Sequence, residues 1–269
     1  MSEDEKLPFT AHLEELRSRL IVCVIAVCLG FVGCFAFKEK LFDILRMPML
    51  SVLPEGETFI FTGVAEAFFT YLKVSFLGGL ILAAPVIIFE FWMFVAPGLY
   101  RREKKFLLPI IFLSAFFFIG GSLFGYFVVF PYGFAFFQGF ANDTIRFLPS
   151  VSEYLSFASK LLLAFGVVFE LPILITGMAS IGIVNVGFLR ANRKYAILIF
   201  FIGAAILTPP DVVTQIMMSI PLMLLYEISI LGAMIFGKKP SDSTDEEEET
   251  DEESSEVVKN QKEATDSES

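Results

Sequence analysis

Long apolar blocks dominate this chain of 269 residues, and they restrict the folds that it can adopt. Hydrophobic residues make up 55% of the sequence, and 33 residues are phenylalanine. In a lipid bilayer every backbone N–H and C=O group must be paired within the protein, so spanning segments are helices or closed barrels. Uncharged blocks of about 20 residues are typical of spanning helices. The sequence therefore predicts an all-α, polytopic membrane protein.

We expect six spanning helices. The apolar blocks lie at about 20–37, 68–96, 106–130, 161–183, 195–207 and 212–236. The third block is expected to end at Pro131, and the segments 38–67 and 131–158 are expected to be external loops that cap the bundle. The fifth block is short, because only 14 residues lie between Lys194 and Pro209. As a helix these residues reach roughly 21 Å, less than the hydrocarbon core of about 30 Å.

The distribution of lysine and arginine predicts the orientation. Twelve of these residues fall before the first block, after the second, after the fourth and after the sixth, whereas the opposite loops contain four. Cytoplasmic loops carry the excess of positive charge. Both termini are therefore expected in the cytoplasm.

The net charge of −10 comes from one segment. Residues 240–269 contain 13 acidic residues and two lysines. A segment so polar and so poor in apolar residues is typical of a disordered extension. We expect a membrane domain over residues 1–237 and an acidic cytoplasmic tail over residues 238–269.

Two sets of carboxylates stand at the predicted cytoplasmic face. Glu103 is the one acid in a loop, residues 97–105, that otherwise carries four positive charges. Glu14 and Glu15 precede the first apolar block and are followed by Arg17 and Arg19. Because guanidinium groups pair bidentately with carboxylates, two acids at one face could bind two arginines of a ligand.

Glu170 lies near the middle of the fourth block, two residues before Pro172. A charge at that depth costs on the order of 3 kcal/mol or more, so intramembrane acids usually mark functional sites. The alternative is a carboxylic acid that bonds carbonyl groups freed by the proline. We expect structural kinks at Pro48, Pro85 and Pro172.

A polar patch surrounds the Pro-Pro turn between the last two blocks. Thr208 and Gln215 flank the turn, and Asp211 follows it. These side chains could hydrogen-bond an incoming transmembrane helix. The alternative is local capping, with Thr208 or Asp211 as the N-cap of the sixth helix.

Four segments together identify a family resemblance. Residues 12–20 (HLEELRSRL), 94–105 (FVAPGLYRREKK), 165–172 (FGVVFELP) and 207–211 (LTPPD) are similar to motifs of TatC, the receptor subunit of the twin-arginine protein translocase. The resemblance extends in order over about residues 7–237. It implies a bacterial inner-membrane protein with six helices in a concave bundle, which binds twin-arginine signal peptides of folded proteins. It also implies transport driven by the proton-motive force.

The resemblance assigns roles to particular residues. It implies that Glu15 and Glu103 bind the signal arginines, whereas Glu14 stands at a variable position. Arg17, Leu99 and Tyr100 lie in the same two motifs and are expected in the same signal-peptide-binding site. Glu170 matches an acid of the concave face.

The resemblance also implies partners. Thr208 and Gln215, with the adjacent Asp211, match positions that dock the single-span subunits TatA and TatB. Ala205 departs from the larger residue of some relatives. Several copies of the chain are expected within a complex with TatB, surrounded by the lipid bilayer.

Two other function classes were considered. A proton-coupled transporter of small solutes could use Glu170 as a relay, although the sequence shows no internal repeat. An intramembrane protease is disfavoured, because no His-Glu-x-x-His motif occurs and the chain contains one histidine. The three cysteines do not share a helix face and predict neither a disulfide framework nor a metal site. We expect no enzymatic activity, no cofactor and no nucleic-acid partner.

Overall fold

The computed structural model describes residues 9–53, 59–60, 62–95, 107–141, 148–207 and 212–237. The helices are α1 (Phe9–Ala36), α2 (Lys38–Leu50), α3 (Glu66–Val95), α4 (Leu107–Phe124), the π-helix η3 (Gly125–Val129), α5 (Phe130–Gln138), α6 (Val151–Phe169), α7 (Leu171–Ser180), α8 (Val186–Ala191), α9 (Arg193–Leu207) and α10 (Val212–Phe236). Within these ranges the only β-type pairing is an isolated parallel bridge between Ile60 and Ser150. The predicted all-α class is confirmed.

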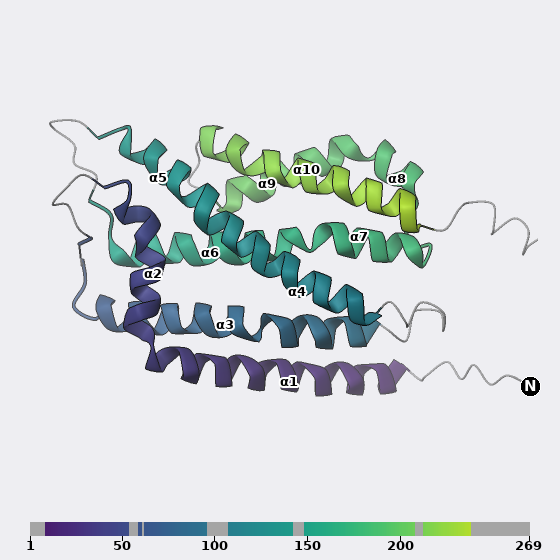
Figure 1. Ribbon diagram of the computed structural model, residues 1–269, viewed down its shortest axis with the longest axis horizontal. Helices are drawn as coiled ribbons and strands as arrows, with labels where there is room; N and C mark the ends of the chain where they lie inside the picture. Colours follow the sequence, from purple (N-terminus) through teal and green to yellow (C-terminus); the bar gives the residue numbers. More distant parts are fainter. Residues whose placement is uncertain are drawn as a thin grey trace, which may run out of the picture.

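Among the described residues, five helical stretches are long and apolar enough to cross a membrane. They are Ala11–Ala36, Glu66–Val95, Leu108–Gln138, Val151–Ser180 and Gln215–Phe236. The remaining block forms α9, which has 15 residues and is about 22 Å long. The described part of the chain begins and ends at the same end of the bundle, which we call the terminal end; α2 and α5 lie at the opposite, loop end (Figure 1).

The third and fourth spans differ from the expected boundaries. The third does not end at Pro131 but continues through η3 and α5 to Gln138. The π-helix η3 ends just before Phe130, whose N–H bonds the carbonyl of Gly125. Helix α5 begins at Phe130, and Pro131 lies in its first turn. A proline is tolerated in a first turn because its missing N–H would lack a helical partner anyway. The fourth span begins at Val151, ten residues earlier than expected, and is broken at Glu170.

The expected external loop 38–67 contains a helix, α2, with Pro48 inside it. Pro48 has no N–H, so the carbonyl of Ile44, one turn earlier, lacks its usual helical donor. The hydroxyl of Tyr126 donates to this carbonyl at 2.5 Å, and the hydroxyl of Tyr154 donates to the carbonyl of Leu45. The proline thus exposes the carbonyl of Ile44, which anchors α2 to the third span, and the bond from Tyr154 anchors α2 to the fourth span. By contrast, α3 continues as a single helix through Pro85.

The first two spans pack closely along their length. Helices α1 and α3 run side by side (Figure 1) and make the most extensive contact between two helices in the fold. They meet at two glycines: a Cβ atom added to Gly30 would lie 2.6 Å from the carbonyl oxygen of Gly79, closer than atoms can pack. Small residues permit such close approach in membranes. This contact fixes the alignment of α1 on α3.

Helix α6 is the centre of the bundle. It packs against α4 and α3 on one side and against α9 on another, while α10 lies over α7 and α9. Its inward side chains are fully or almost fully buried; they are Leu155, Ala158, Leu161, Leu162 and Phe165. The core is therefore built around the fourth span.

Glu66 holds the loop end together. One carboxylate oxygen accepts the N–H groups of Thr62 and Gly63 at 2.5 and 3.0 Å, just before α3. The other accepts the hydroxyl of Ser150 and the N–H of Ser152, both at 2.8 Å, in the first turn of α6. A carboxylate at a helix N-terminus satisfies unpaired N–H groups and interacts favourably with the helix dipole. One side chain thus caps two helices and joins the segments that precede them.

We predict that Glu66→Ala lowers the midpoint of thermal unfolding of the detergent-solubilised protein by several degrees, because five hydrogen-bond donors, the hydroxyl of Thr62 among them, lose their acceptor at once. Glu153→Ala is the matched control, since Glu153 is an exposed acid in the first turn of α6. Differential scanning fluorimetry compares the two. Equal midpoints for both variants would contradict the capping role of Glu66.

Candidate functional site

An ionic cluster at the terminal end joins the first two spans. The Nε and Nη2 atoms of Arg19 donate to one carboxylate oxygen of Glu15, at 3.0 and 2.6 Å. The Nη1 atom of the same guanidinium donates to Glu90 at 2.8 Å. The three side chains are partly buried, with exposed fractions of 27% for Glu15, 21% for Arg19 and 15% for Glu90. A guanidinium is thus held between two carboxylates.

Local sequence and helix packing together create this cluster. Glu15 and Arg19 are four residues apart on α1, so they share a face, and the acid lies on the N-terminal side, the favourable order. Glu90 lies 71 residues later in the sequence, near the end of α3. Because α1 and α3 are antiparallel and fixed at Gly30 and Gly79, the start of one lies beside the end of the other. No motif in the sequence indicates that Glu90 lies beside Glu15.

The neighbours of Glu15 along the helix face elsewhere. Glu14 and Arg17 are both exposed, and neither makes an ion pair with any residue that the structure describes. The two adjacent acids of the sequence, Glu14 and Glu15, are therefore separated by the helical turn. The acid that joins Glu15 comes from another helix.

An aromatic stack borders the cluster. The ring of His12 lies on that of Phe94 with centroids 4.3 Å apart and an angle of 16°. The Nδ1 atom of His12 is 3.9 Å from a carboxylate oxygen of Glu15, beyond hydrogen-bond distance. The single histidine thus packs between the ends of α1 and α3 and forms one wall of the ionic cluster.

Several predicted site residues lie outside the described residues. These are Glu103, Leu99 and Tyr100 in the loop between α3 and α4, and Thr208 and Asp211 in the turn between α9 and α10. The acidic tail also lies outside them. The loop joins the end of α3, where Glu90 and Phe94 lie, to the start of α4.

Glu170 occupies the break between α6 and α7. Its side chain is 9% exposed, and one of its carboxylate oxygens is buried without a hydrogen-bond partner among the described residues. Its backbone carbonyl accepts the N–H groups of Ile173 and Leu174. Pro172 lies in the first turn of α7, so the missing N–H interrupts the ladder at this point.

A polar chain leads to Glu170 through the interior of the bundle. The indole Nε1 of Trp92 donates to the hydroxyl of Ser114 at 2.9 Å, and Ser114 in turn interacts with the carboxyl group of Glu170. Ser114 is fully buried. Three helices, α3, α4 and the α6–α7 pair, thus contribute one side chain each. The unpaired oxygen of Glu170 leaves this chain with an unused acceptor.

Gln215 ties the short hairpin together. Its Nε2 atom donates to the carbonyl of Phe201 at 2.9 Å, which links the first turn of α10 to α9. The side chain is half-buried. This contact is an interhelical bond and not the N-cap that the sequence suggested at Thr208 or Asp211. Among the described residues, no donor bonds the amide oxygen of Gln215.

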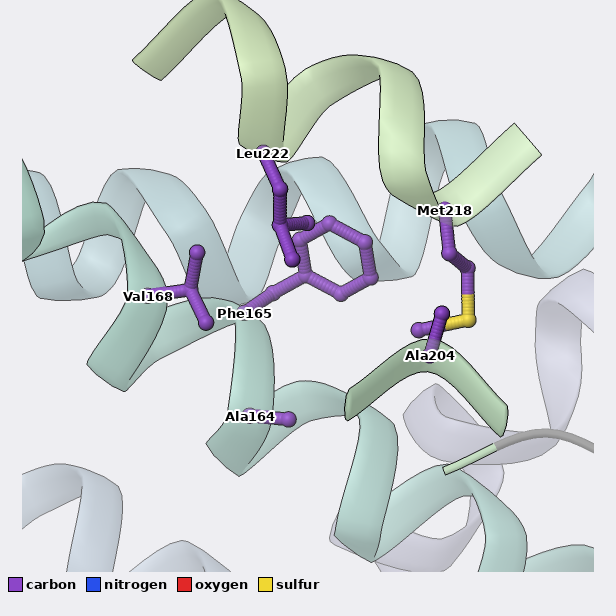
Figure 2. Close-up of a pocket in the computed structure, with 6 residues that line it drawn as sticks. All are labelled: Ala164, Phe165, Val168, Ala204, Met218 and Leu222. Atoms are coloured by element: carbon purple, nitrogen blue, oxygen red, sulfur yellow. The ribbon is translucent and has the colours of Figure 1, made fainter. Parts of the chain in front are cut away.

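A small hollow lies between α6, α9 and α10 (Figure 2). Its lining side chains are all apolar: Ala164, Phe165, Val168, Ala204, Met218 and Leu222. Such a lining offers no polar group to orient a substrate. In the part of the chain that the structure describes, no three His, Cys, Asp or Glu side chains cluster as metal ligands. The candidate functional carboxylates among the described residues are therefore Glu15, Glu90 and Glu170, which lie outside the hollow.

Comparisons with known proteins agree with this arrangement. Residues 11–221 match the family model of the Sec-independent protein translocase protein TatC. A TatC of Desulforapulum autotrophicum is 66% identical over 91% of this chain and 90% of its own length. The TatC of Escherichia coli K12 is 38% identical over 88% of this chain and 92% of its own length.

A solved structure is also similar. The crystal structure of a twin-arginine translocase receptor, TatC, superposes with a TM-score of 0.75 at 41% identity, covering 83% of this chain and 98% of that one. The residues matched by the family model include nearly all of α1, all of α3 and of the α6–α7 pair, and the first part of α10. The chain therefore belongs to the TatC family and is a component of a Sec-independent, twin-arginine protein translocase.

Proposed function

We propose that this protein binds the twin-arginine signal peptides of folded proteins at the terminal end of its bundle. The observation that carries the proposal is the seat of Arg19, where carboxylates of α1 and α3 hold a guanidinium by three hydrogen bonds. The same side chains have the chemistry to bind an arginine of another chain. A solved relative is described as the twin-arginine translocase receptor.

Two arginines require a second carboxylate site. We assign that role to Glu103, in the loop that joins the ends of α3 and α4. Leu99 and Tyr100 of the same loop and Arg17 of α1 complete the proposed signal-peptide-binding site. The four cations of the loop would contact lipid headgroups instead of the signal.

The topology follows from the same arrangement. The described chain starts and finishes at the terminal end (Figure 1), so it crosses the bundle an even number of times and α9 counts as a sixth, short crossing. In the sequence, twelve lysine and arginine residues lie in or beside the segments whose described helix ends meet at the terminal end, and four lie in or beside those of the loop end. We therefore assign this end and both termini to the cytoplasmic face of a bacterial inner membrane.

We further propose that TatA and TatB dock at the α9–α10 hairpin and that the proton-motive force drives transport. Gln215 uses its side-chain N–H to bond α9, and its side-chain oxygen accepts no hydrogen bond from another described residue, and Thr208 and Asp211 lie close to it in the sequence. Several copies of the chain, each with TatB, would form the receptor complex. The acidic tail, residues 238–269, is assigned no part in binding.

The alternative, a proton-coupled transporter of small solutes, has less support. The hollow in Figure 2 is apolar and small. Glu170 is joined to a serine and a tryptophan instead of to a second ionisable group, whereas a proton relay needs a chain of such groups.

We predict that Glu15→Gln weakens the binding of an Arg-Arg signal peptide by about tenfold, since a charge-assisted hydrogen bond contributes roughly 1.5–3 kcal/mol when buried and less here. Glu103→Arg should abolish binding. Fluorescence anisotropy of a labelled signal peptide on membranes that contain the translocase measures both.

Glu14→Gln is the matched control for Glu15→Gln, because Glu14 is the adjacent acid on the exposed face of α1, and its affinity should equal that of the wild type. A Lys-Lys peptide should bind the wild type more weakly, because lysine lacks the planar fork of donors. Wild-type affinity in the Glu15 and Glu103 variants would refute this site.

We predict that Glu170→Ala reduces export of a folded reporter severalfold while signal-peptide affinity stays near that of the wild type, since Glu170 lies deep in the bundle and not at the terminal end. Glu170→Gln, which keeps the shape and a polar group beside Ser114, should be milder. Export rate and peptide affinity are measured on the same membranes. An equal loss of both in Glu170→Ala would place Glu170 in the primary binding site instead.

A further inference from the structure

We infer that Arg19 occupies the site of the signal arginine when no peptide is bound. When a peptide binds, Arg19 stays paired with Glu90, and Glu15 pairs with the incoming arginine instead. This inference rests on the proposed function, because it concerns how the same Glu15 becomes available. It assigns Glu90 as a positioning residue for signal recognition.

Glu15 is already paired with Arg19 in this structure. Two N–H groups of Arg19 converge on a single oxygen of Glu15, at 2.6 and 3.0 Å. A signal arginine that binds Glu15 must therefore compete with Arg19 for that carboxylate. The cluster resembles a complex in which the chain supplies its own ligand.

Arg19 has a second partner, Glu90. Its Nη1 atom bonds Glu90 at 2.8 Å on the side of the guanidinium opposite Nε. Arg19 can therefore release Glu15 without becoming unpaired. Leaving a partly buried charge without a partner would otherwise oppose the exchange.

The net charge of the cluster also favours the binding of a second arginine. Two carboxylates and one guanidinium give the cluster a net charge of −1, and one more guanidinium makes it neutral, with each arginine on its own acid. Without Glu90 the pair of Glu15 and Arg19 is already neutral, and an incoming arginine would make it positive. Glu90 thus supplies the negative charge that the second arginine neutralises.

The partial exposure of these side chains allows the ion pairs to exchange. The three side chains are between 15% and 27% exposed, so water can solvate them during the exchange, and partly exposed ion pairs are individually weak. Arg19 also lies at the start of the apolar part of α1, where a long side chain can reach the interface. The pair can therefore open without unfolding of α1.

A double-mutant cycle tests the inference. The affinity of an Arg-Arg signal peptide is measured for the wild type, Glu90→Gln, Arg19→Gln and the double variant, in membranes that contain the whole translocase. We expect Glu90→Gln to weaken binding about tenfold, because Arg19 is then retained on Glu15. In the Arg19→Gln background the same substitution should weaken binding by no more than about threefold, since no competitor is present.

Controls separate this result from a general loss of structure. Glu227→Gln removes an acid from another interhelical pair, Arg193 and Glu227 at 2.7 Å, and should leave the affinity unchanged. Thermal unfolding is recorded for each variant. Recovery of affinity in the double variant relative to Glu90→Gln would itself show that the Glu90 substitution leaves the protein folded.

The outcomes distinguish the inference from the proposed function. If Glu15→Gln reduces affinity but Glu90→Gln has the same effect with and without Arg19, Glu90 contacts the peptide directly or is only structural, and the exchange is wrong. If Glu90→Gln binds as well as the wild type, the exchange is likewise wrong. If Glu15→Gln itself binds normally, the proposed arginine site fails, and the inference fails with it.

Discussion

The close contact between α1 and α3 is the constraint on which the candidate site depends. Gly30 and Gly79 leave no room for a side chain between the two backbones, so the helices can be aligned in only one way. That alignment places the start of α1 beside the end of α3. As a consequence, a guanidinium four residues from one acid reaches a second acid 71 residues away. A shift of one helical turn, about 5.4 Å, would separate them.

The described carboxylates show how a membrane protein accommodates charge. At the loop end Glu66 accepts hydrogen bonds from two helix starts, and at the terminal end Glu15 and Glu90 share a guanidinium. In both arrangements hydrogen-bond donors satisfy the carboxylates: neutral backbone and hydroxyl groups at Glu66, and a guanidinium at Glu15 and Glu90. Glu170 differs, because it lies at a helix break within a span and one of its buried oxygens has no hydrogen-bond partner among the described residues. Buried polar groups are usually paired, and this exception at a helix break motivates its assignment to the transport step.

Prolines serve different purposes at three places in the bundle. In α2, Pro48 frees a carbonyl that a tyrosine of the third span then binds. At the α6–α7 junction, Pro172 follows the break that positions Glu170. In α3, Pro85 lies within one continuous helix. The same residue type therefore acts as an anchor, as a break, or as neither, and the neighbouring helices decide which.

Apolar blocks, charge distribution and short motifs were sufficient to predict the helical class, the family and the sixth block, which forms α10 with the expected boundaries. These features are local, because lipid excludes unpaired backbone and leaves only helices for such segments. The helix that continues past Pro131 and the helix within the loop 38–67 were not predicted, since polar and proline-containing segments become helical here through packing. The sequence also contained no signal that places Glu90 in the site. Its pairing with Arg19 depends on the contact of two glycines in different helices, a distance that no local pattern encodes and that only the packed bundle establishes.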